Sequence, residues 1–248
     1  MSGHSKWSTI KHKKAANDSR RGKLFSKLVK EITAAARVGG GDIDTNPRLR
    51  TAIAAAKSSN VPNDNIGKAI LRGTGELEGE TYEEILYEGY GPGGVAVMIE
   101  VLTDNRNRAV AAIRHAFSKH EGRIGERGCV AWGFDKCGLI VVTPDSIEEE
   151  ELFMTAVEAG AEDVTASATG MEIVTPFEMF DGVLTAIQET SAEVQLAEIS
   201  MIPQNTVKLE GKEAERMLRL MDALDELDDV QKVYANFDIP DNLLEAAA

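Results

Sequence analysis

The chain has 248 residues, of which 43% are hydrophobic and 27% are charged. This composition excludes a disordered chain and provides enough apolar material for one large domain or two to three ordinary ones. We expect no membrane span, because no apolar run approaches the roughly 18 residues that a spanning helix needs, and no secretory signal at the polar N-terminus. Since only Cys129 and Cys137 occur, we expect no disulfide framework and a cytoplasmic location.

The net charge of −14 is distributed very unevenly. Residues 1–75 hold 15 Lys and Arg against five acids, a local balance of +10, and the rest of the chain carries −24. A basic segment is attracted to phosphate, whereas an acidic body is repelled by it. The N-terminal part is therefore the predicted binding surface, with a solvated charged face that has no partner as the alternative.

The N-terminal third is typical of a small helical domain. Residues 4–16 form a polar, basic arm, and Asn17 or Ser19 is suited to cap a helix that continues to about Val38 and ends at three glycines. At 100° per residue this helix has an apolar side and a cationic side, the latter carrying Lys23, Lys27 and Lys30. Further helices are predicted after the Asn46–Pro47 cap and after Pro62.

A linker rich in Gly and Glu at 73–80 precedes a region in which strands and helices alternate. Strands are predicted at 93–104, 129–134, 138–144, 163–175 with a hinge near Gly170, 193–203, 206–211 and 230–240, and helices at 105–122, 148–160, 176–192 and 212–227. Residues 138–203 have the split βαβ order, and the flanking segments give a second such unit if the first is inserted into it.

The predicted fold class is therefore α+β with three domains, a helical one followed by two ferredoxin-like βαβ-βαβ domains, one inserted in the other. We expect boundaries at 1–78 for the basic helical domain with its N-terminal arm, 79–136 plus 204–248 for the discontinuous domain, and 137–203 for the inserted domain.

Enzymatic and metal chemistry have weak support. The glycine-dense segment 89–94 precedes a strand instead of opening a helix, so a tight turn is favoured over a phosphate loop. Cys129 and Cys137 lack further ligand partners, and His115 and His120 are five apart on a helix and diverge. We predict no catalytic residues, no metal and no cofactor. The acidic run Asp225–Asp229 is interpreted as an exposed helix end.

The basic residues have better support. Those predicted to bind nucleic acid are Lys6, Trp7, Lys11, His12, Lys13, Lys14, Arg20, Arg21, Lys23, Lys27, Lys30, Arg106 and Arg108. Arg106 and Arg108 lie at a strand-to-helix junction and either extend the cationic surface or are simply solvated. Trp7 either stacks on a base or packs on the helical domain, and the sequence does not choose between them.

Long motifs resemble one known family. They are the opening Met-Ser-Gly-His-Ser-Lys-Trp with Ile-Lys-His-Lys-Lys, Gly-Gly-Gly-Asp before Asn-Pro-Arg-Leu-Arg, Tyr-Glu-Gly-Tyr-Gly-Pro-Gly-Gly, and Asp-Asn-Arg-Asn-Arg at 104–108. Over essentially the whole chain, they are similar to the YebC/PmpR family. The resemblance implies three domains and a cytosolic, non-enzymatic transcriptional regulator that binds promoter DNA. It also implies an alternative, a translation factor that acts on the ribosome, in some members at proline runs.

Two function classes and one less favoured class remain open at this stage, and a pure protein-interaction role through the acidic domains is compatible with the same observations. The first is a DNA-binding transcription regulator, and the second an RNA-binding, ribosome-associated translation factor. The third is an enzyme with a site between the two α/β domains, near the glycine segment and Arg106, which requires a deep pocket with a buried titratable group. No membrane partner is expected, and the sequence does not set the oligomeric state.

Overall fold

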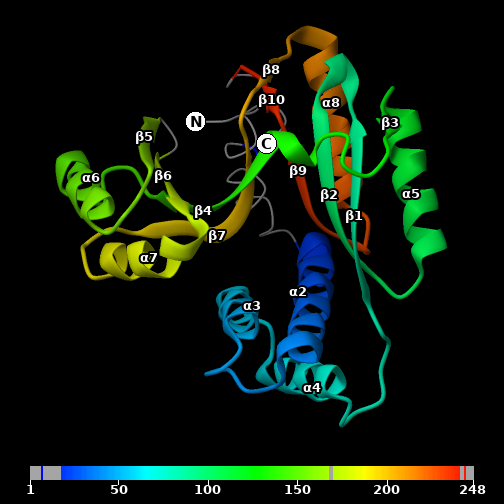
Figure 1. The fold of residues 1–248 in the computed structure, drawn as a ribbon, viewed down its shortest axis with the longest axis horizontal. Helices are drawn as coiled ribbons and strands as arrows, with labels where there is room; N and C mark the ends of the chain where they lie inside the picture. The colour runs from blue at the N-terminus through cyan, green and yellow to red at the C-terminus, as the bar shows by residue number, and fades with distance from the viewer. Residues whose placement is uncertain (1–6, 8–17, 168–169, 241–242, 244–248) are drawn as a thin grey trace.

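The computed structural model describes residue 7, residues 18–167, residues 170–240 and residue 243. It has an N-terminal helical part followed by two sheets with helices, so the predicted α+β class is confirmed (Figure 1). The helical part lies at the bottom of Figure 1, one sheet lies above it and the other lies to its side.

Within the described residues, three helices form the N-terminal part, and they lie where the sequence predicts them. They are α2 (Asp18–Gly39), α3 (Pro47–Ser58) and α4 (Asn63–Thr74). Asn46 caps α3, because its Oδ1 accepts the Leu49 amide at 3.1 Å. Its Nδ2 donates to the carbonyls of Ala35 and Gly40 at 2.9 and 2.8 Å, so this buried amide also ties α3 to the end of α2. Asn46 thus caps the start of α3 and holds it against the C-terminal end of α2.

The helices enclose a small core of their own. It contains Ile32 of α2, Leu49 and Ile53 of α3 and Ile66 of α4, all buried. Helices α2 and α4 cross closely at Gly73, where an added Cβ would lie 2.5 Å from the Thr33 carbonyl oxygen and 2.6 Å from Ala36 Cβ. The absence of a side chain at Gly73 therefore sets the separation of the two helices.

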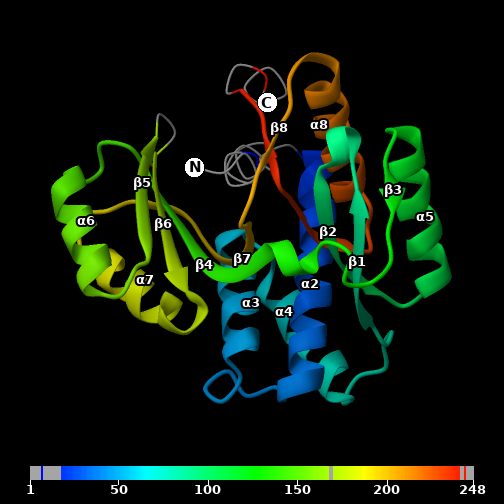
Figure 2. The same cartoon turned by 45° about the horizontal axis from the view of Figure 1, so that its top comes forward.

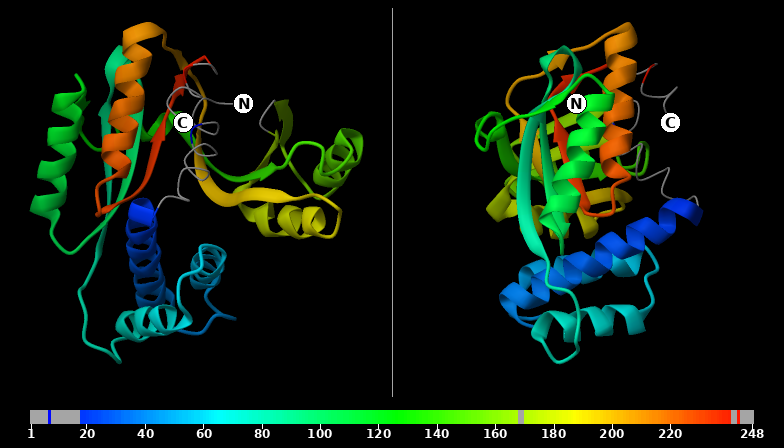
Figure 3. Two further views of the ribbon diagram at one scale, coloured as in Figure 1. Left: turned by 180° about the vertical axis from the view of Figure 1, so that it is seen from behind. Right: turned by 90° about the vertical axis from the view of Figure 1, so that its right-hand side faces the viewer.

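The second part is built on a four-stranded antiparallel sheet of order β3-β1-β2-β9. Its elements are β1 (Glu83–Tyr90), β2 (Ala96–Thr103), α5 (Arg106–Lys119), β3 (Arg123–Ile124), α8 (Gly211–Asp225) and β9 (Val230–Ala235). Figure 3 shows α5 and α8 side by side over the sheet. The alternate residues Val97, Ile99 and Val101 of β2 face these helices, and Met98 packs in a second cluster. The short parallel pair β8 (Val207–Lys208) and β10 (Phe237–Asp238) adjoins this part.

The start of this second part differs from the predicted element order. β1 is absent from the predicted elements, and the strand predicted at 129–134 is wrong, because the chain there forms a turn and the 3-10 helix η2 (Ala131–Gly133) before β4. β1 has three glutamates and a glycine in eight residues, so its composition does not favour a strand. The glycine segment is the tight turn of the β1–β2 hairpin, with the 3-10 helix η1 (Pro92–Gly94) and positive φ at Gly93 and Gly94.

The third part has the predicted split βαβ order. Its elements, in chain order, are β4 (Phe134–Val142), α6 (Glu149–Glu158), β5 (Asp163–Ser167), β6 (Gly170–Pro176), the 3-10 helix η3 (Phe177–Met179), α7 (Phe180–Gln188) and β7 (Val194–Pro203). The sheet order is β5-β6-β4-β7, with every pair antiparallel. Helices α6 and α7 pack on one face, with Leu152, Phe180 and Ile187 in the core. As Figure 2 shows, this part lies to one side of the others.

Separate hydrophobic clusters fill the three parts. We propose that they are the cores of three domains, with the boundaries expected from the sequence except at the start of the inserted one. The inserted sheet begins slightly earlier than the predicted residue 137, because β4 already pairs with β7 at Phe134 and Pro203.

Candidate nucleic-acid interface

The cationic side of α2 contacts the C-terminal end of α8. Lys23 Nζ donates to the Glu226 carbonyl at 3.1 Å, and Lys27 Nζ donates to the Asp225 carbonyl at 2.6 Å. Lys30 Nζ donates to the Asp228 carbonyl at 2.9 Å. A spacing of four and three residues places these lysines on one side of α2, and we call this set of contacts the lysine clasp. Cations are favoured there because the carbonyls at a helix C-terminus carry partial negative charge.

Carboxylates reinforce the lysine clasp. Lys27 Nζ lies 3.2 Å from Asp225 Oδ1, and Lys30 Nζ lies 3.1 Å from Asp229 Oδ1. The acidic run Asp225–Asp229 is therefore not the exposed helix end that was expected. Asp229 is only 7% exposed, and the run binds the lysines of the helical part. The two partners are 199 residues apart in the chain, so no local pattern indicates their contact.

Arg108 at the start of α5 binds the same Asp229. Its Nη2 donates to both carboxylate oxygens at 2.9 Å, and its Nε donates to Oδ2 at 3.1 Å. Nη2 also donates to Asp104 Oδ1 at 2.6 Å. These hydrogen bonds, first to Asp229 and then to Asp104, raise the pKa of Arg108. The structure thus brings the basic side of α2 and the first turn of α5 together at one carboxylate.

The predicted site residues fall into three groups. The first group lies outside the described residues; its members are Lys6, Lys11, His12, Lys13 and Lys14, together with the side chains of Arg20 and Arg21. A second group binds acceptors of the chain itself, so its members do not form the continuous open cationic face that was expected; they are Lys23, Lys27, Lys30 and Arg108. Arg106 is exposed on α5. That these residues bind nucleic acid stays a prediction.

Trp7 does not pack on the helical part, which is one of the two alternatives expected for it. It is 7% exposed and belongs to the hydrophobic cluster of the second part, together with Val97 and Met217. The expected packing on the helical part is therefore corrected, and an indole that is buried in this way has no open face for a base.

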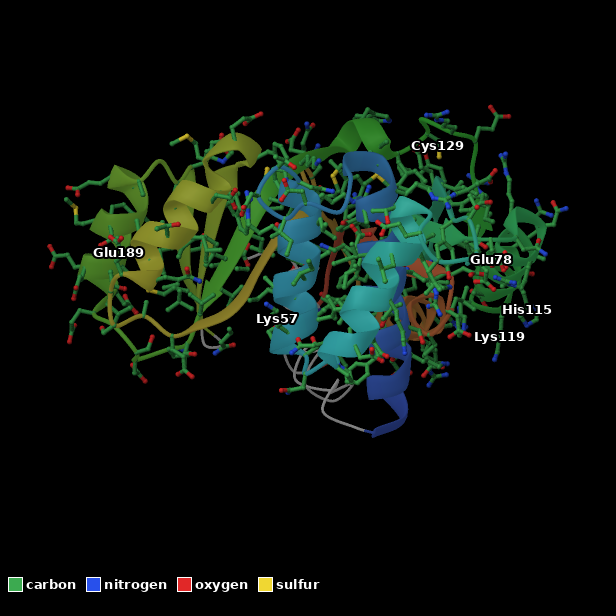
Figure 4. All side chains as sticks on the ribbon, turned by 90° about the horizontal axis from the view of Figure 1, so that it is seen from below. Lys57, Glu78, His115, Lys119, Cys129 and Glu189 are labelled. Carbon is green, nitrogen blue, oxygen red and sulfur yellow. The ribbon has the colours of Figure 1, made fainter. Side chains whose placement is uncertain are left out.

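A second basic segment extends beyond the predicted Arg106 and Arg108. Residues 105–128 hold six Lys and Arg against two Glu, within an otherwise acidic remainder, and a windowed charge count would have found them. Arg114, Lys119, Arg123 and Arg127 are exposed. Figure 4 shows Lys119 and His115 projecting at the outer side of α5, far from Lys57 on α3. A hollow of about 500 Å³ beside them is lined by Arg114, Phe117, Ser118, Gly122, Arg123, Ile124, Gly125 and Glu126.

The other candidate chemistries gain no support from the described residues. Cys129 and Cys137 are unpaired thiols, and burial raises the pKa of each. Among the residues that the structure describes, no group of three or more His, Cys, Asp or Glu side chains could hold a metal ion. The hollow lies at the C-terminal end of α5, whereas Arg106 lies at its N-terminal end, so it is not the expected enzyme pocket. None of the described helices combines the length and the hydropathy that a membrane-spanning helix requires.

Family models and relatives match the chain over nearly its whole length. The TACO1/YebC N-terminal domain matches residues 5–76, and the TACO1/YebC second and third domain matches residues 82–237. A protein of Desulforapulum autotrophicum named "probable transcriptional regulatory protein" is 59% identical over 246 residues, which cover 99% of this chain and 100% of the relative. One of the same name from Geobacter sulfurreducens is 58% identical over 245 residues, 99% of each chain.

A solved structure has the same fold. The crystal structure of a conserved hypothetical protein from Aquifex aeolicus matches with a TM-score of 0.82 and 48% identity, over 90% of this chain and 92% of that one. Together with the two matching family models, this similarity shows that the chain belongs to the TACO1/YebC family.

Proposed function

We propose that the protein is a non-enzymatic, cytoplasmic regulator of gene expression that binds DNA through a basic surface. The observation that carries the proposal is the concentration of 15 basic residues against five acids in residues 1–75 of a chain whose net charge is −14. The relatives named as probable transcriptional regulatory proteins support a regulatory role.

The surface neutralises backbone phosphates and releases their counterions. Such contacts supply affinity but carry no sequence information. The basic residues of the N-terminal arm act together with the exposed cations of α5, among them Arg106 and Arg114. Lys23, Lys27 and Lys30 join this surface only when the nucleic acid displaces the end of α8, because the lysine clasp occupies their ammonium groups.

Base readout contributes little to binding. Helix α3 would have to enter a groove if the helical part were a helix-turn-helix domain. Its exposed residues include Ala54 and Ala55, which cannot hydrogen-bond to bases. Its Arg50 donates to the carbonyls of Ile43 and Asp44 within the chain. Binding to duplex DNA is therefore of low sequence specificity.

The lack of base-reading side chains on α3 favours a second candidate function, that of a translation factor that binds ribosomal RNA. Structured RNA is recognised largely by shape and by its backbone, so a basic surface without a recognition helix suits it. With this function the protein would act on the ribosome, and its activity would be to relieve the stalling of translation.

Titration of the full chain with promoter duplex, scrambled duplex and ribosomes at several salt concentrations tests both candidates. For a contact of about six phosphates, the slope of log K against log salt on duplex DNA is about −5. The Lys13→Glu, Lys14→Glu variant should have a shallower slope, and an unchanged slope removes the arm from the interface. Tight ribosome binding with equal, weak binding to both duplexes rejects the DNA function, and the reverse result rejects the ribosomal one.

A further inference from the structure

The inserted part of the chain has an extreme charge composition. Residues 137–203 contain 14 acidic residues and no Lys, Arg or His. The rest of the chain is balanced, with 27 basic and 27 acidic residues, so this segment accounts for the whole net charge of −14. A strongly acidic surface repels phosphate and attracts a cationic partner.

Helix α6 of this part also exposes large apolar side chains. Phe153, Met154 and Val157 are 48%, 52% and 46% exposed. At 100° per residue these three fall within an arc of about 100°, on the side opposite the buried Leu152 and Ala156. The helix therefore has two apolar sides, one in the core of the inserted part and one facing solvent.

The outward apolar side extends beyond α6 to Met179, which is 43% exposed. A Cβ added at Gly160, just after α6, would lie 2.7 Å from Met179 Cε, so the methionine side chain lies against the end of this helix. Exposed apolar side chains that are grouped in this way mark interaction sites more often than single ones do. Methionine adapts its shape to a partner, and two of the four members of the patch are methionines.

Carboxylates surround the patch. Glu150 lies within the arc of the apolar side chains, and Glu151 and Glu158 border it; all three are exposed. Figures 1 and 2 both show α6 at the outer end of the inserted part, away from α2–α4 and α5. A partner can therefore reach α6 without contact with the lysine clasp.

We propose that the exposed face of α6 docks a cationic, amphipathic segment of a partner protein. The apolar side chains of this partner segment cover Phe153, Met154 and Val157, and its Lys or Arg side chains pair with Glu150 and Glu158. Charge complementarity selects this occupant, because nucleic acid, an anionic membrane surface and the same face of a second copy would all bring negative charge against the carboxylates. An amphipathic helix on an apolar face is a common form of peptide recognition.

Fluorescence anisotropy of the full chain with a labelled amphipathic Lys/Leu helix peptide tests the proposal in vitro. The Phe153→Ser, Val157→Ser variant should weaken binding by about tenfold or more, since buried apolar anchors dominate such interfaces. Val38→Ser is the matched control, because Val38 is 76% exposed on α2 and should leave binding unchanged. The proposal is overturned if the wild type, the Phe153→Ser, Val157→Ser variant and Val38→Ser bind the Lys/Leu peptide with equal affinity. It is also overturned if the wild type binds a Glu/Leu peptide as tightly as the Lys/Leu peptide.

Photo-crosslinking in cells identifies the class of the natural occupant. A photoreactive amino acid at position 154 of the full chain should attach to a protein peptide rich in Lys and Arg, and the adduct should become scarcer with Glu150→Gln and Glu158→Gln. Thermal unfolding of each variant confirms that it is folded. An adduct with nucleic acid, an adduct with a second copy of this chain, or no adduct overturns the proposal.

Discussion

Asp229 and Arg108 are 121 residues apart in the chain, yet Arg108 binds both oxygens of the Asp229 carboxylate. Lys30 of α2 binds the same carboxylate and also lies over the Tyr82 ring, with Nζ 5.6 Å from the centroid. Since Asp229 directly precedes β9, one buried acid connects the helical part to α5 and to the sheet. The orientation of the helical part thus depends on this junction.

The first prediction concerns this junction. Asp229→Asn replaces one acceptor oxygen by an NH2 group that faces Arg108 and Lys30, so two cations lose their shared counterion. We expect the free energy of unfolding to fall by about 1–3 kcal/mol. Urea denaturation measures it. Asp228→Asn is the control, because Asp228 binds Lys30 only through its main-chain carbonyl, and its stability should stay close to that of the wild type. Equal stability of all three proteins would mean that the junction contributes nothing.

A second prediction links the lysine clasp to nucleic-acid binding. Asp225→Asn removes the carboxylate that holds Lys27 and lowers the negative charge beside α2. We expect tighter binding of duplex DNA at low salt and a log-log salt slope that is steeper by about 0.9 for each further phosphate that the protein neutralises. Filter binding at several salt concentrations gives the slope. Glu189→Gln, on the inserted part, is a charge-matched control whose slope should not change. A slope for Asp225→Asn equal to that of the wild type would remove the clasped lysines from the interface.

Local features of the sequence were sufficient to predict much of this fold. The starts of α3 and α4 follow from Asn46–Pro47 and from Pro62, because capping and helix periodicity depend on neighbouring residues. The split βαβ order of the inserted part follows from its alternating pattern for the same reason. β1 was not predicted because three of its eight residues are glutamates, and the buried one, Glu88, is tolerated only through contacts made elsewhere: it accepts amide hydrogens from residues 128, 130 and 131.

The candidate site was less predictable than the fold. Charge counts indicated which residues of α2 are cationic, but not that the acidic run after α8 would bind them from 198 residues away. Trp7 likewise packs in the cluster around β2 and α8, far from it in the chain. Such pairings depend on how the parts of the chain are oriented, and no sequence periodicity records that orientation.

A third prediction concerns the crossing of α2 and α4. Gly73→Ala places a methyl group against the Thr33 carbonyl and Ala36, so the helices must move apart. We expect a loss of about 1–3 kcal/mol in the free energy of unfolding, as for other overpacked sites. Gly67→Ala on the same helix is the control: nothing lies within 4 Å of its added Cβ, and it should gain about 0.5–1 kcal/mol from helix propensity. Opposite shifts of the thermal midpoint confirm the prediction, whereas a stabilising Gly73→Ala contradicts it.

The last prediction concerns acid stability. The Glu88 carboxylate is 2% exposed and accepts the amides of Gly128, Val130 and Ala131 at 2.6, 2.8 and 2.8 Å. Burial raises the pKa of Glu88, but these hydrogen bonds and the charge of Arg127 together lower it below its ordinary value of 4.5. Because the folded pKa lies below the unfolded one, ionised Glu88 stabilises the fold above pH 4.5, and this contribution is lost as the pH falls through the folded pKa.

Glu88→Gln should therefore lower the free energy of unfolding at neutral pH by about 1–3 kcal/mol, since the amide group cannot accept all three hydrogen bonds. The difference from the wild type should shrink below pH 4.5, where Glu88 of the wild type becomes protonated in the unfolded and then in the folded chain. Urea denaturation across this pH range measures both effects. Glu83→Gln, an exposed position of the same strand, should follow the wild-type curve throughout. A constant difference between Glu88→Gln and the wild type down to the acid limit would show that the charge of Glu88 does not stabilise the loop.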